Sequence, residues 1–532
     1  MSRKLFVLML CAGLLGAAGA ARADVVSDWN EELLDAVRTD KTPPPRASRA
    51  MAIVHVSIFD ALVGILGGYS PYHVTDDAPA GASPEAAAAA AAHRALSALF
   101  PAQQATFDAA LAASLATIAD GNAAAIGVAW GQDVADQILA LRVDDGHDRV
   151  VAYNTIDGAN WWIPTGPAFA AGLLPQWPLV TPWALQTGSQ LRAGPPPSLT
   201  SVQYTIAFNE VKRLGRATGS TRTPEQTQIA LFWADGAGTA TPPGHWLVIA
   251  QHIAEEEGLS LLEKSRLLAL LSIAEADAAI VSWDHKYAYN HWRPFTGIPN
   301  ADKDGNPNTV ADPAWTPLIV TPPFPAYTSG HSTFSGAAAR VLGQFFGTDN
   351  FSFDDGSDGL PGVTRSFTSF SQAANEAGQS RIYGGIHWQY DNQVGLQTGR
   401  ALGDLVFFSQ LGPLAASGPC VPGIANLCLQ GGRFKVEALW KTGGVGGHGF
   451  AVADTADSGR FWFFNEDNTE LVVKVLEGCA VNDHYWFFAS GLTDVEVLVI
   501  VTDTQTGRTR RYFNPQGKAY LPVQDIEAFA CQ

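Results

Sequence analysis

Apolar residues recur at helical spacing through most of the chain between residue 24 and about residue 411. This spacing predicts helices over residues 48–66, 84–99, 103–118, 201–213, 224–232 and 261–280. Long segments rich in proline and glycine separate the helices at residues 159–200, 236–244 and 295–326. Loops of this length in a compact domain are more often functional walls than spacers, so we expect them to border a site.

The pattern changes near Pro413. Beyond it, apolar and polar residues alternate as in strands, over residues 433–440, 470–476 and 495–501, with a turn at 503–507. We therefore expect a mainly α protein in which a helical-bundle domain (24–411) is followed by a small antiparallel β-domain (419–532), a sandwich.

The first 23 residues have the plan of a secretory signal peptide. Arg3 and Lys4 precede an apolar run that ends near Ala20, and the small-x-small sequence 21–23 follows it. The run is too short to span a bilayer comfortably. We expect cleavage before Asp24 and a secreted or periplasmic protein.

Composition narrows the function classes. A hydrophobic fraction of 47% supports sizeable cores, and only 16% charged residues excludes a disordered chain. Without residues 1–23, 30 basic residues stand against 51 acidic ones, a net charge of −21. Such a charge disfavours nucleic acid and anionic membranes as partners, and we expect no integral membrane protein. An anion site would have to gather the few positive charges locally.

Four cysteines follow the signal peptide, and all lie in the last quarter of the chain. Export makes two disulfides plausible, and three pairings are possible. Proximity alone favours Cys420 with Cys428 and Cys479 with Cys531. No pair has CxxC spacing, which argues against a zinc or dithiol redox site.

The first candidate segment runs from Lys286 to Pro294. If it is helical, Lys286 and Arg293 lie two turns and about 10 Å apart on one face, and Pro294 ends the helix. A solvated basic face is the simpler interpretation. However, Tyr and Trp residues interrupt the segment, which indicates burial, and a buried pair of cations favours an anion as its partner.

The second segment is a tight turn, Ser329-Gly330-His331, that runs into a helix of small residues. Free N–H groups at the start of such a helix, with the Gly330 amide and the Ser329 hydroxyl, can donate to an oxyanion. His331 would lie at the rim of that site.

The third segment contains Arg381, two glycines, His387 and Asp391. The glycine pair can break a helix and let Arg381 and His387 converge. Asp391, four residues after His387, could accept from Nδ1–H and leave Nε2 free as a nucleophile or ligand. A helix cap beside a core histidine is the simpler alternative.

Together the three segments resemble the tripartite motif of the vanadium-dependent haloperoxidases and the related type 2 phosphatidic acid phosphatases: K-x6-RP, PSGH and SR-x5-H-x3-D. Every fixed position matches except Thr328, which replaces the proline before Ser-Gly-His. We expect little chemical consequence from this exchange. The resemblance is close over residues 283–392 and loose over 24–411.

This resemblance implies vanadate as cofactor. His387 would bind vanadium, and the equatorial oxygens would be held by Lys286, Arg293, Ser329, Gly330 and Arg381. His331 would act as acid–base, and Lys286 would make peroxide electrophilic toward halide. The implied partners are hydrogen peroxide, a halide and an organic acceptor that the motif does not identify.

Aromatic residues beside the motif point to the halide. Trp283 and Phe324 resemble the halide pocket of the chloride-oxidising branch, and brominating relatives tend to carry histidine where Phe324 stands. Chloride or bromide is therefore expected, although an aromatic residue at either place also suits a core.

Other polar residues receive structural interpretations. Asp235 is a candidate to pair with a site arginine, and His285 is expected to be structural. Residues 302–306 resemble the start of a calcium loop but lack the closing glutamate, which favours a polar turn.

Two other functions stay open. An acid phosphatase could use the same pocket, with His387 as nucleophile and His331 as leaving-group acid. The protein could also be a surface-binding module that acts through its β-domain, with a silent helical domain. The motif alone does not decide the halide or the oligomeric state.

Overall fold

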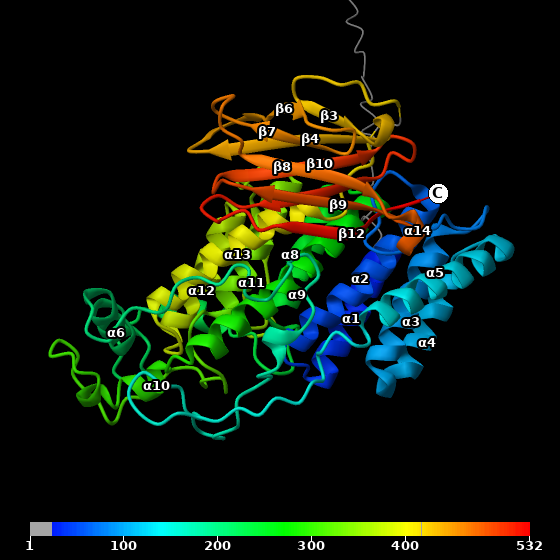
Figure 1. The fold of residues 1–532 in the computed structure, drawn as a ribbon. Coiled ribbons are helices and arrows are strands. Elements are labelled where there is room, and N and C mark those ends of the chain that lie inside the picture. Colours follow the sequence, from blue (N-terminus) through cyan, green and yellow to red (C-terminus); the bar gives the residue numbers. More distant parts are fainter. Residues whose placement is uncertain (1–23, 416–417, 532) are drawn as a thin grey trace, which may run out of the picture.

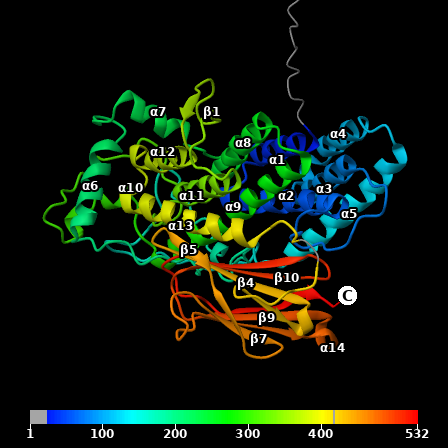
Figure 2. The ribbon, with the colours of Figure 1, turned by 90° about the horizontal axis from the view of Figure 1, so that it is seen from above.

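A computed structural model describes residues 24–415 and 418–531, in which a helical part and a β part lie side by side (Figures 1 and 2). The proposed signal peptide, residues 1–23, lies outside the described residues. The helices are α1 (Val25–Asp40), α2 (Pro44–Leu66), α3 (Pro84–Leu99), α4 (Gln104–Leu115), α5 (Gly121–Arg142), α6 (Val202–Leu214), α7 (Pro224–Phe232), α8 (Thr241–Glu256), α9 (Leu261–Tyr289), α10 (Pro294–Gly297), α11 (Gly330–Phe345), α12 (Phe370–Tyr383), α13 (Gln389–Ser409) and α14 (Cys479–Asn482).

The mainly α class is confirmed. Each of the six predicted helices is present, as α2, α3, α4, α6, α7 and α9, with ends that shift by a few residues. Helix α9 continues nine residues beyond its predicted end at residue 280. The predicted loop 236–244 is partly wrong, because α8 begins at Thr241. Pro242 and Pro243 fit there because N–H groups of the first turn have no partner within the helix.

The helical core is built on α2 and α9. Helix α2 is buried from residue 47 to residue 63, and α9 is buried along most of its length, so both are surrounded by other helices. Among the described residues, α2 is the one helix long and apolar enough to cross a membrane, and 83% of its most apolar stretch is buried, as expected of a core helix. Helices α11 and α13 pack beside α9 and carry parts of the candidate site (Figure 1).

The C-terminal part contains two five-stranded antiparallel sheets. One has the order β11-β10-β4-β3, with β5 also paired to β4, and the other has the order β12-β9-β8-β7-β6. A two-stranded sheet, β1 with β2, lies within the helical part. The strands are β1 (Phe353–Asp355), β2 (Arg365–Phe367), β3 (Asn426–Leu429), β4 (Phe434–Thr442), β5 (Val445–His448), β6 (Phe450–Ala453), β7 (Ser458–Trp462), β8 (Leu471–Glu477), β9 (His484–Gly491), β10 (Glu496–Asp503), β11 (Thr509–Asn514) and β12 (Val523–Ala530).

The predicted strands 433–440, 470–476 and 495–501 correspond to β4, β8 and β10. Alternate residues of β4 are buried, and they join those of β8 in one hydrophobic cluster. The period-2 pattern of residues 433–440 therefore corresponds to one buried face of β4.

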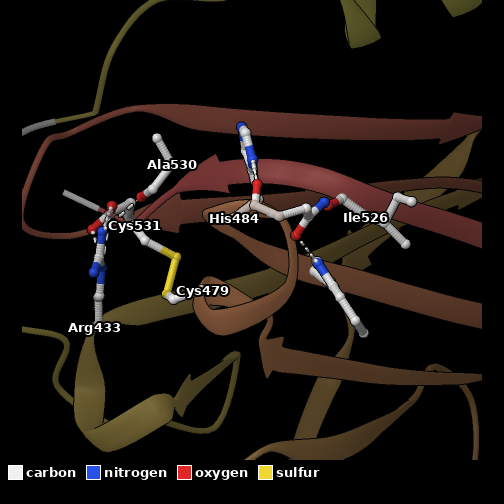
Figure 3. Close-up of a disulfide and its surroundings, with 9 residues drawn as sticks. Arg433, Cys479, His484, Ile526, Ala530 and Cys531 are labelled. Atoms are coloured by element: carbon white, nitrogen blue, oxygen red, sulfur yellow. Dashed lines mark hydrogen bonds and ion pairs between the residues drawn. A yellow bond between two sulfur atoms is a disulfide. The ribbon is translucent and has the colours of Figure 1, made fainter.

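Two disulfides form with the pairing favoured by proximity, Cys420–Cys428 and Cys479–Cys531. Figure 3 shows that the second joins α14 to the end of β12, with Arg433 beside it. Arg433 donates to the Ala530 carbonyl at 3.2 Å, so the chain end is tied to the first sheet as well.

Candidate active site

The first motif segment leaves the helix before it reaches Arg293. Helix α9 ends at Tyr289, because Asn290 takes the left-handed conformation, with φ at 48°. Asparagine is one of the few residues that adopt this conformation readily. Arg293 then lies on extended backbone. The prediction that Lys286 and Arg293 share one helix face is therefore wrong, although both side chains are fully buried.

Lys286 is held by backbone carbonyls. Its Nζ donates to Pro325 at 3.2 Å and Ala326 at 3.1 Å, and also to Thr328. An ammonium group has three donors, so these bonds use all of them. Burial, reinforced by the charge of Arg293, holds the pKa of Lys286 well below its usual value. The three carbonyl acceptors nevertheless favour the ammonium form, because a neutral amine has only two N–H groups to donate. In this structure the lysine fixes the loop that enters α11.

Arg293 joins the first segment to the third. Its Nε donates to the Phe324 carbonyl at 2.9 Å, and its Nη1 lies 2.7 Å from the Ile386 carbonyl and 2.9 Å from His387 Nε2. Its Nη2 is buried and has no hydrogen-bond partner among the described residues. Burial lowers the pKa of Arg293 to about 9.

The Ser-Gly-His turn forms as predicted. Ser329 is the N-cap of α11, and its Oγ accepts from the Ser332 amide at 3.3 Å. Gly330 is the first helical residue, so its amide is among those without a partner within the helix. Thr328 is fully buried before the turn. Its presence in place of proline therefore does not prevent the helix from starting here.

The glycines of the third segment break the helix, as expected. Helix α12 ends at Tyr383, and Gly385 has a φ of +79°. A Cβ at Gly385 would lie 2.3 Å from the Gly215 carbonyl oxygen, so this close approach also requires glycine. The break allows Arg381 on α12 and His387 beyond it to line the same cavity.

Arg381 is anchored on one side only. Its Nη1 donates to the Trp233 carbonyl at 2.6 Å and lies 3.4 Å from that of Ala234. Its Nε is buried and has no partner among the described residues. Burial lowers the pKa of Arg381 to about 10.

The predicted contact of His387 with Asp391 is present at 2.9 Å, between Nδ1 and Oδ2. The two residues do not share a helix face, because His387 precedes α13 and Asp391 lies in its first turn. With Nδ1 as donor, Nε2 is the acceptor, and it faces the Arg293 guanidinium. Burial and three neighbouring cations hold the pKa of His387 well below its usual value, so the imidazole is neutral. Burial raises the pKa of Asp391 to about 7.

These groups border a cavity of about 440 Å³. Seven residues singled out from the sequence line it, namely Trp283, Phe324, Gly330, His331, Arg381, His387 and Asp235. The lining does not include Lys286, Arg293, Ser329 or Asp391. However, Arg293 and Asp391 both form hydrogen bonds with the ring of His387. The predicted loops also contribute, since residues 165–173 and 319–324 form much of the remaining wall.

Sequence reasoning missed His245 and misjudged Asp235. Asp235 pairs with His245 at 3.1 Å, and the other ring nitrogen of His245 lies 2.8 Å from Asp355. No described arginine forms an ion pair with Asp235, which corrects the expected pairing. Asp235 Oδ2 instead lies 4.0 Å from His331 Nε2. Only the fold brings these three segments together, so no local pattern could have indicated the cluster.

His331 is neutral, and its ring lies near the backbone of Trp233 and Ala234. Burial, followed by the charge of Arg381, holds its pKa well below the usual value. Its Nε2 has no hydrogen-bond partner among the described residues. One nitrogen of this unprotonated imidazole can accept a proton, although its lowered pKa makes it a weaker base than a free histidine.

Trp283 and Phe324 form an aromatic pair in the cavity wall. Their ring centroids are 4.9 Å apart, and Lys286 Nζ lies 5.1 Å from the centroid of Phe324. Trp283 is fixed by a 3.1 Å bond from Nε1 to the Leu173 carbonyl. The pair therefore offers a rigid apolar wall next to a buried cation.

The residues expected to be structural have ordinary partners. His285 accepts from the Ala193 amide at 2.8 Å, and its other ring nitrogen lies 2.7 Å from the Val281 carbonyl. Asp304 accepts from the Asn306 amide and from Thr309, both at 2.7 Å, as in a polar turn. Within residues 24–415 and 418–531, no cluster of three or more His, Cys, Asp or Glu side chains could hold a metal ion.

Comparison with known proteins finds relatives among the vanadium-dependent haloperoxidases. A family model described as the VCPO second helical-bundle domain matches residues 266–411, which include all three motif segments. The vanadium chloroperoxidase of Curvularia inaequalis is 28% identical over an alignment of 347 residues, and the match covers 49% of this chain. The chain spans 56% of that relative's length.

Solved structures extend the comparison. The first bacterial vanadium-dependent iodoperoxidase superposes with a TM-score of 0.64 at 32% identity, covering 72% of this chain and 95% of its own. An apo-type bacterial vanadium-dependent chloroperoxidase gives a TM-score of 0.56 at 16% identity, over 69% and 94% of the two chains, which shows a shared fold. With the motif segments converging on one cavity and a relative matched almost end to end, the chain belongs to the vanadium-dependent haloperoxidase family.

Proposed function

We propose that this protein oxidises halide with hydrogen peroxide to a hypohalous acid equivalent, with vanadate as its cofactor. The supporting observation is a buried group of cations that lacks matching carboxylates. Lys286, Arg293 and Arg381 surround one neutral imidazole. The carboxylate that acts on the first two is Asp391 and the one that acts on Arg381 is Asp235, and neither forms an ion pair with these cations. Such an arrangement favours an anionic guest.

The residues present fit an oxyanion. Arg293 Nη2 and Arg381 Nε are buried donors without partners among the described residues. An unsatisfied buried donor costs about 1–3 kcal/mol, and more when it is charged. A tetrahedral or trigonal-bipyramidal oxyanion could accept from both guanidinium groups. His387 Nε2, an acceptor in this tautomer, supplies a lone pair for the central atom.

The residues proposed to hold vanadate are His387 as ligand through Nε2, with Arg293, Arg381, Ser329 and the Gly330 amide toward its oxygens. Ligation at Nε2 would replace the hydrogen bond from Arg293 Nη1 and release that N–H toward the oxyanion. Lys286 would act through its charge while its N–H groups hold the loop before α11. When bound, vanadate supplies the Lewis acidity that activates peroxide toward halide.

His331 is proposed to move the protons. The overall reaction is H₂O₂ + X⁻ + H⁺ → HOX + H₂O, in which the O–O bond breaks and halide donates an electron pair to oxygen. The neutral ring of His331 lines the cavity and can take a proton from peroxide and return it to the departing oxygen. Asp235, 4.0 Å away, faces the charge that this step places on the ring.

The Trp283–Phe324 pair supports chloride or bromide as the halide, held against an apolar wall near Lys286. Iodide joins these candidates because a structural relative is an iodoperoxidase.

Reconstitution with orthovanadate tests the proposal. We would measure vanadate binding by calorimetry, peroxide-dependent oxidation of iodide, bromide and chloride, and aryl-phosphate hydrolysis without vanadate. His387→Ala is expected to abolish vanadate binding and halide oxidation, whereas His252→Ala, an exposed histidine on α8, should change neither. Phosphate hydrolysis without any halide oxidation would instead establish the acid phosphatase alternative.

We also propose that residues 24–411 are the catalytic domain, that residues 419–532 form a separate β-sandwich, and that residues 1–23 direct export. Mass spectrometry of exported protein should find Asp24 at its N-terminus. Retention of residues 1–23 in that protein would contradict cleavage.

A further inference from the structure

The cavity is larger than the proposed inorganic chemistry needs. Its volume is about 440 Å³. At about 30 Å³ for each water-sized group, a four-oxygen oxyanion with peroxide and halide fills roughly 210 Å³. Pockets that bind small organic molecules have volumes of about 300–1,000 Å³. The remaining space is therefore large enough for part or all of a small organic molecule.

We call the lining around His331, Arg381 and His387 the base of the cavity, and residues 165–173 and 319–323 its upper wall. The lining residues of the upper wall are mainly proline, alanine and aliphatic, with hydroxyl groups from Thr165 and Thr321. The other charged lining residues are Asp235, which is paired with His245, and Lys41. A charged organic molecule would find few partners there.

Two loops make this wall, and hydrogen bonds fix them to each other. The Leu173 amide donates to the Pro323 carbonyl at 2.8 Å, and Thr165 Oγ1 donates to the Thr321 carbonyl at 3.4 Å. The Leu173 carbonyl accepts from Tyr287 on α9 at 2.7 Å. The wall is therefore tied to a core helix and is pre-formed, as expected of a binding pocket.

Apolar side chains continue from the wall to the rim. Val320 lines the cavity and is 68% exposed, and Phe169, between the lining residues Ala168 and Ala170, is 65% exposed. Large apolar side chains exposed next to a pocket are typical of a ligand-binding surface.

We propose that the upper cavity binds an uncharged, apolar organic molecule, which accepts the oxidised halogen before the halogen leaves the protein. The reaction is R–H + HOX → R–X + H₂O. A C–H bond breaks, a C–X bond forms, the proton joins the hydroxide released from HOX, and the substrate carbon is oxidised by two electrons while the halogen is reduced. This inference rests on the proposed function and names its acceptor class.

The test compares two phenols, thymol and a charged phenolsulfonate. With the vanadate-loaded enzyme, peroxide and bromide, we expect the ratio of brominated thymol to brominated phenolsulfonate to exceed the ratio given by reagent hypobromite at least tenfold. Val320→Asp should move this ratio at least threefold toward the reagent value and weaken thymol binding to a similar extent. Val150→Asp, at a site 96% exposed and outside this cavity, should change neither.

A wild-type product ratio equal to that of reagent hypobromite would overturn the proposal, because the halogen would then react after release. Iodide oxidation to triiodide, measured without any organic molecule, separates the two ideas. Normal iodide oxidation with no thymol binding would contradict only the organic site. Thymol binding followed by tryptophan fluorescence, with no iodide oxidation, would support the site and contradict the oxidase function.

Discussion

Gly385 connects the stability of the helical part to the geometry of the candidate site. It has a φ of +79°, and a Cβ at this position would lie 2.3 Å from the Gly215 carbonyl oxygen and 3.0 Å from Pro317 Cβ. The break that it makes after α12 sets the positions of Arg381 and His387. We therefore predict that Gly385→Ala destabilises the fold and disturbs the site together.

The magnitude has two parts. Left-handed backbone costs about 1–2 kcal/mol for a residue with a Cβ, and overpacking against a fixed neighbour costs about 1–3 kcal/mol. Their sum, about 2–5 kcal/mol, is the expected loss in the free energy of unfolding. Gly347 offers a matched control, because it is exposed, has a φ of +71°, and would place an added Cβ in open space, with nothing within 4 Å. Gly347→Ala should cost only the first part, about 1–2 kcal/mol.

Urea unfolding followed by tryptophan fluorescence would measure both variants, and calorimetry at 15 °C would measure their vanadate affinity. Gly385→Ala should lose more stability than Gly347→Ala and should also bind vanadate more weakly. The reasoning would be refuted if the two variants were equally stable, or if Gly385→Ala bound vanadate as the wild type does.

Three further outcomes follow from the contacts. Arg381→Lys removes the unpartnered Nε–H and should weaken vanadate binding, measured by calorimetry, roughly 10–100-fold, because a charged hydrogen bond contributes about 1.5–3 kcal/mol. The control Arg94→Lys, at an exposed ion pair, should leave vanadate binding unchanged. His245→Gln should cost about 3–5 kcal/mol near pH 6 because it leaves buried carboxylates unpaired. Burial opposes the charged ring, but two aspartates outweigh burial and hold the pKa of His245 well above its usual value, so its stabilisation is fully present below pH 6.5 and is lost as pH rises through the folded pKa. Urea unfolding measured from below pH 6.5 upward would check that sign. A difference in unfolding free energy between the wild type and His245→Gln that widens as pH rises would contradict it. Replacing Cys479 and Cys531 by serine opens a loop with a sequence separation of 52 and should cost about 4 kcal/mol in unfolding of the β part, whereas an unchanged midpoint would show that the bond is dispensable.

Much of the site could be predicted from sequence because its groups are rare polar residues in apolar surroundings. Lys286, Arg381 and His387 stood out for this reason, and all three are buried. The helix break at Gly385 was predictable because glycine favours a left-handed conformation. These features depend on local sequence, where pattern and propensity are informative.

The remaining features depend on tertiary contacts. His245 and Asp355 are 110 residues apart, and only the packing of α8 beside β1 makes them neighbours. The end of α9 at Asn290 was not predicted because asparagine is also compatible with a helix, whereas Pro294 is the stronger helix-stop signal. The carbonyls around Lys286 belong to the backbone, which a pattern of side chains does not describe.

The unpartnered guanidinium donors have a consequence for how the protein is stored and assayed. Phosphate presents nearly the same tetrahedron of oxygens as vanadate, so in a phosphate buffer the two anions should compete for the same binding site. Phosphate at a hundred times its dissociation constant would raise the free energy of unfolding by about 2.7 kcal/mol. A preparation made in phosphate would then resist heat well while showing little halide oxidation, and exchange into a buffer without phosphate should restore the response to added vanadate.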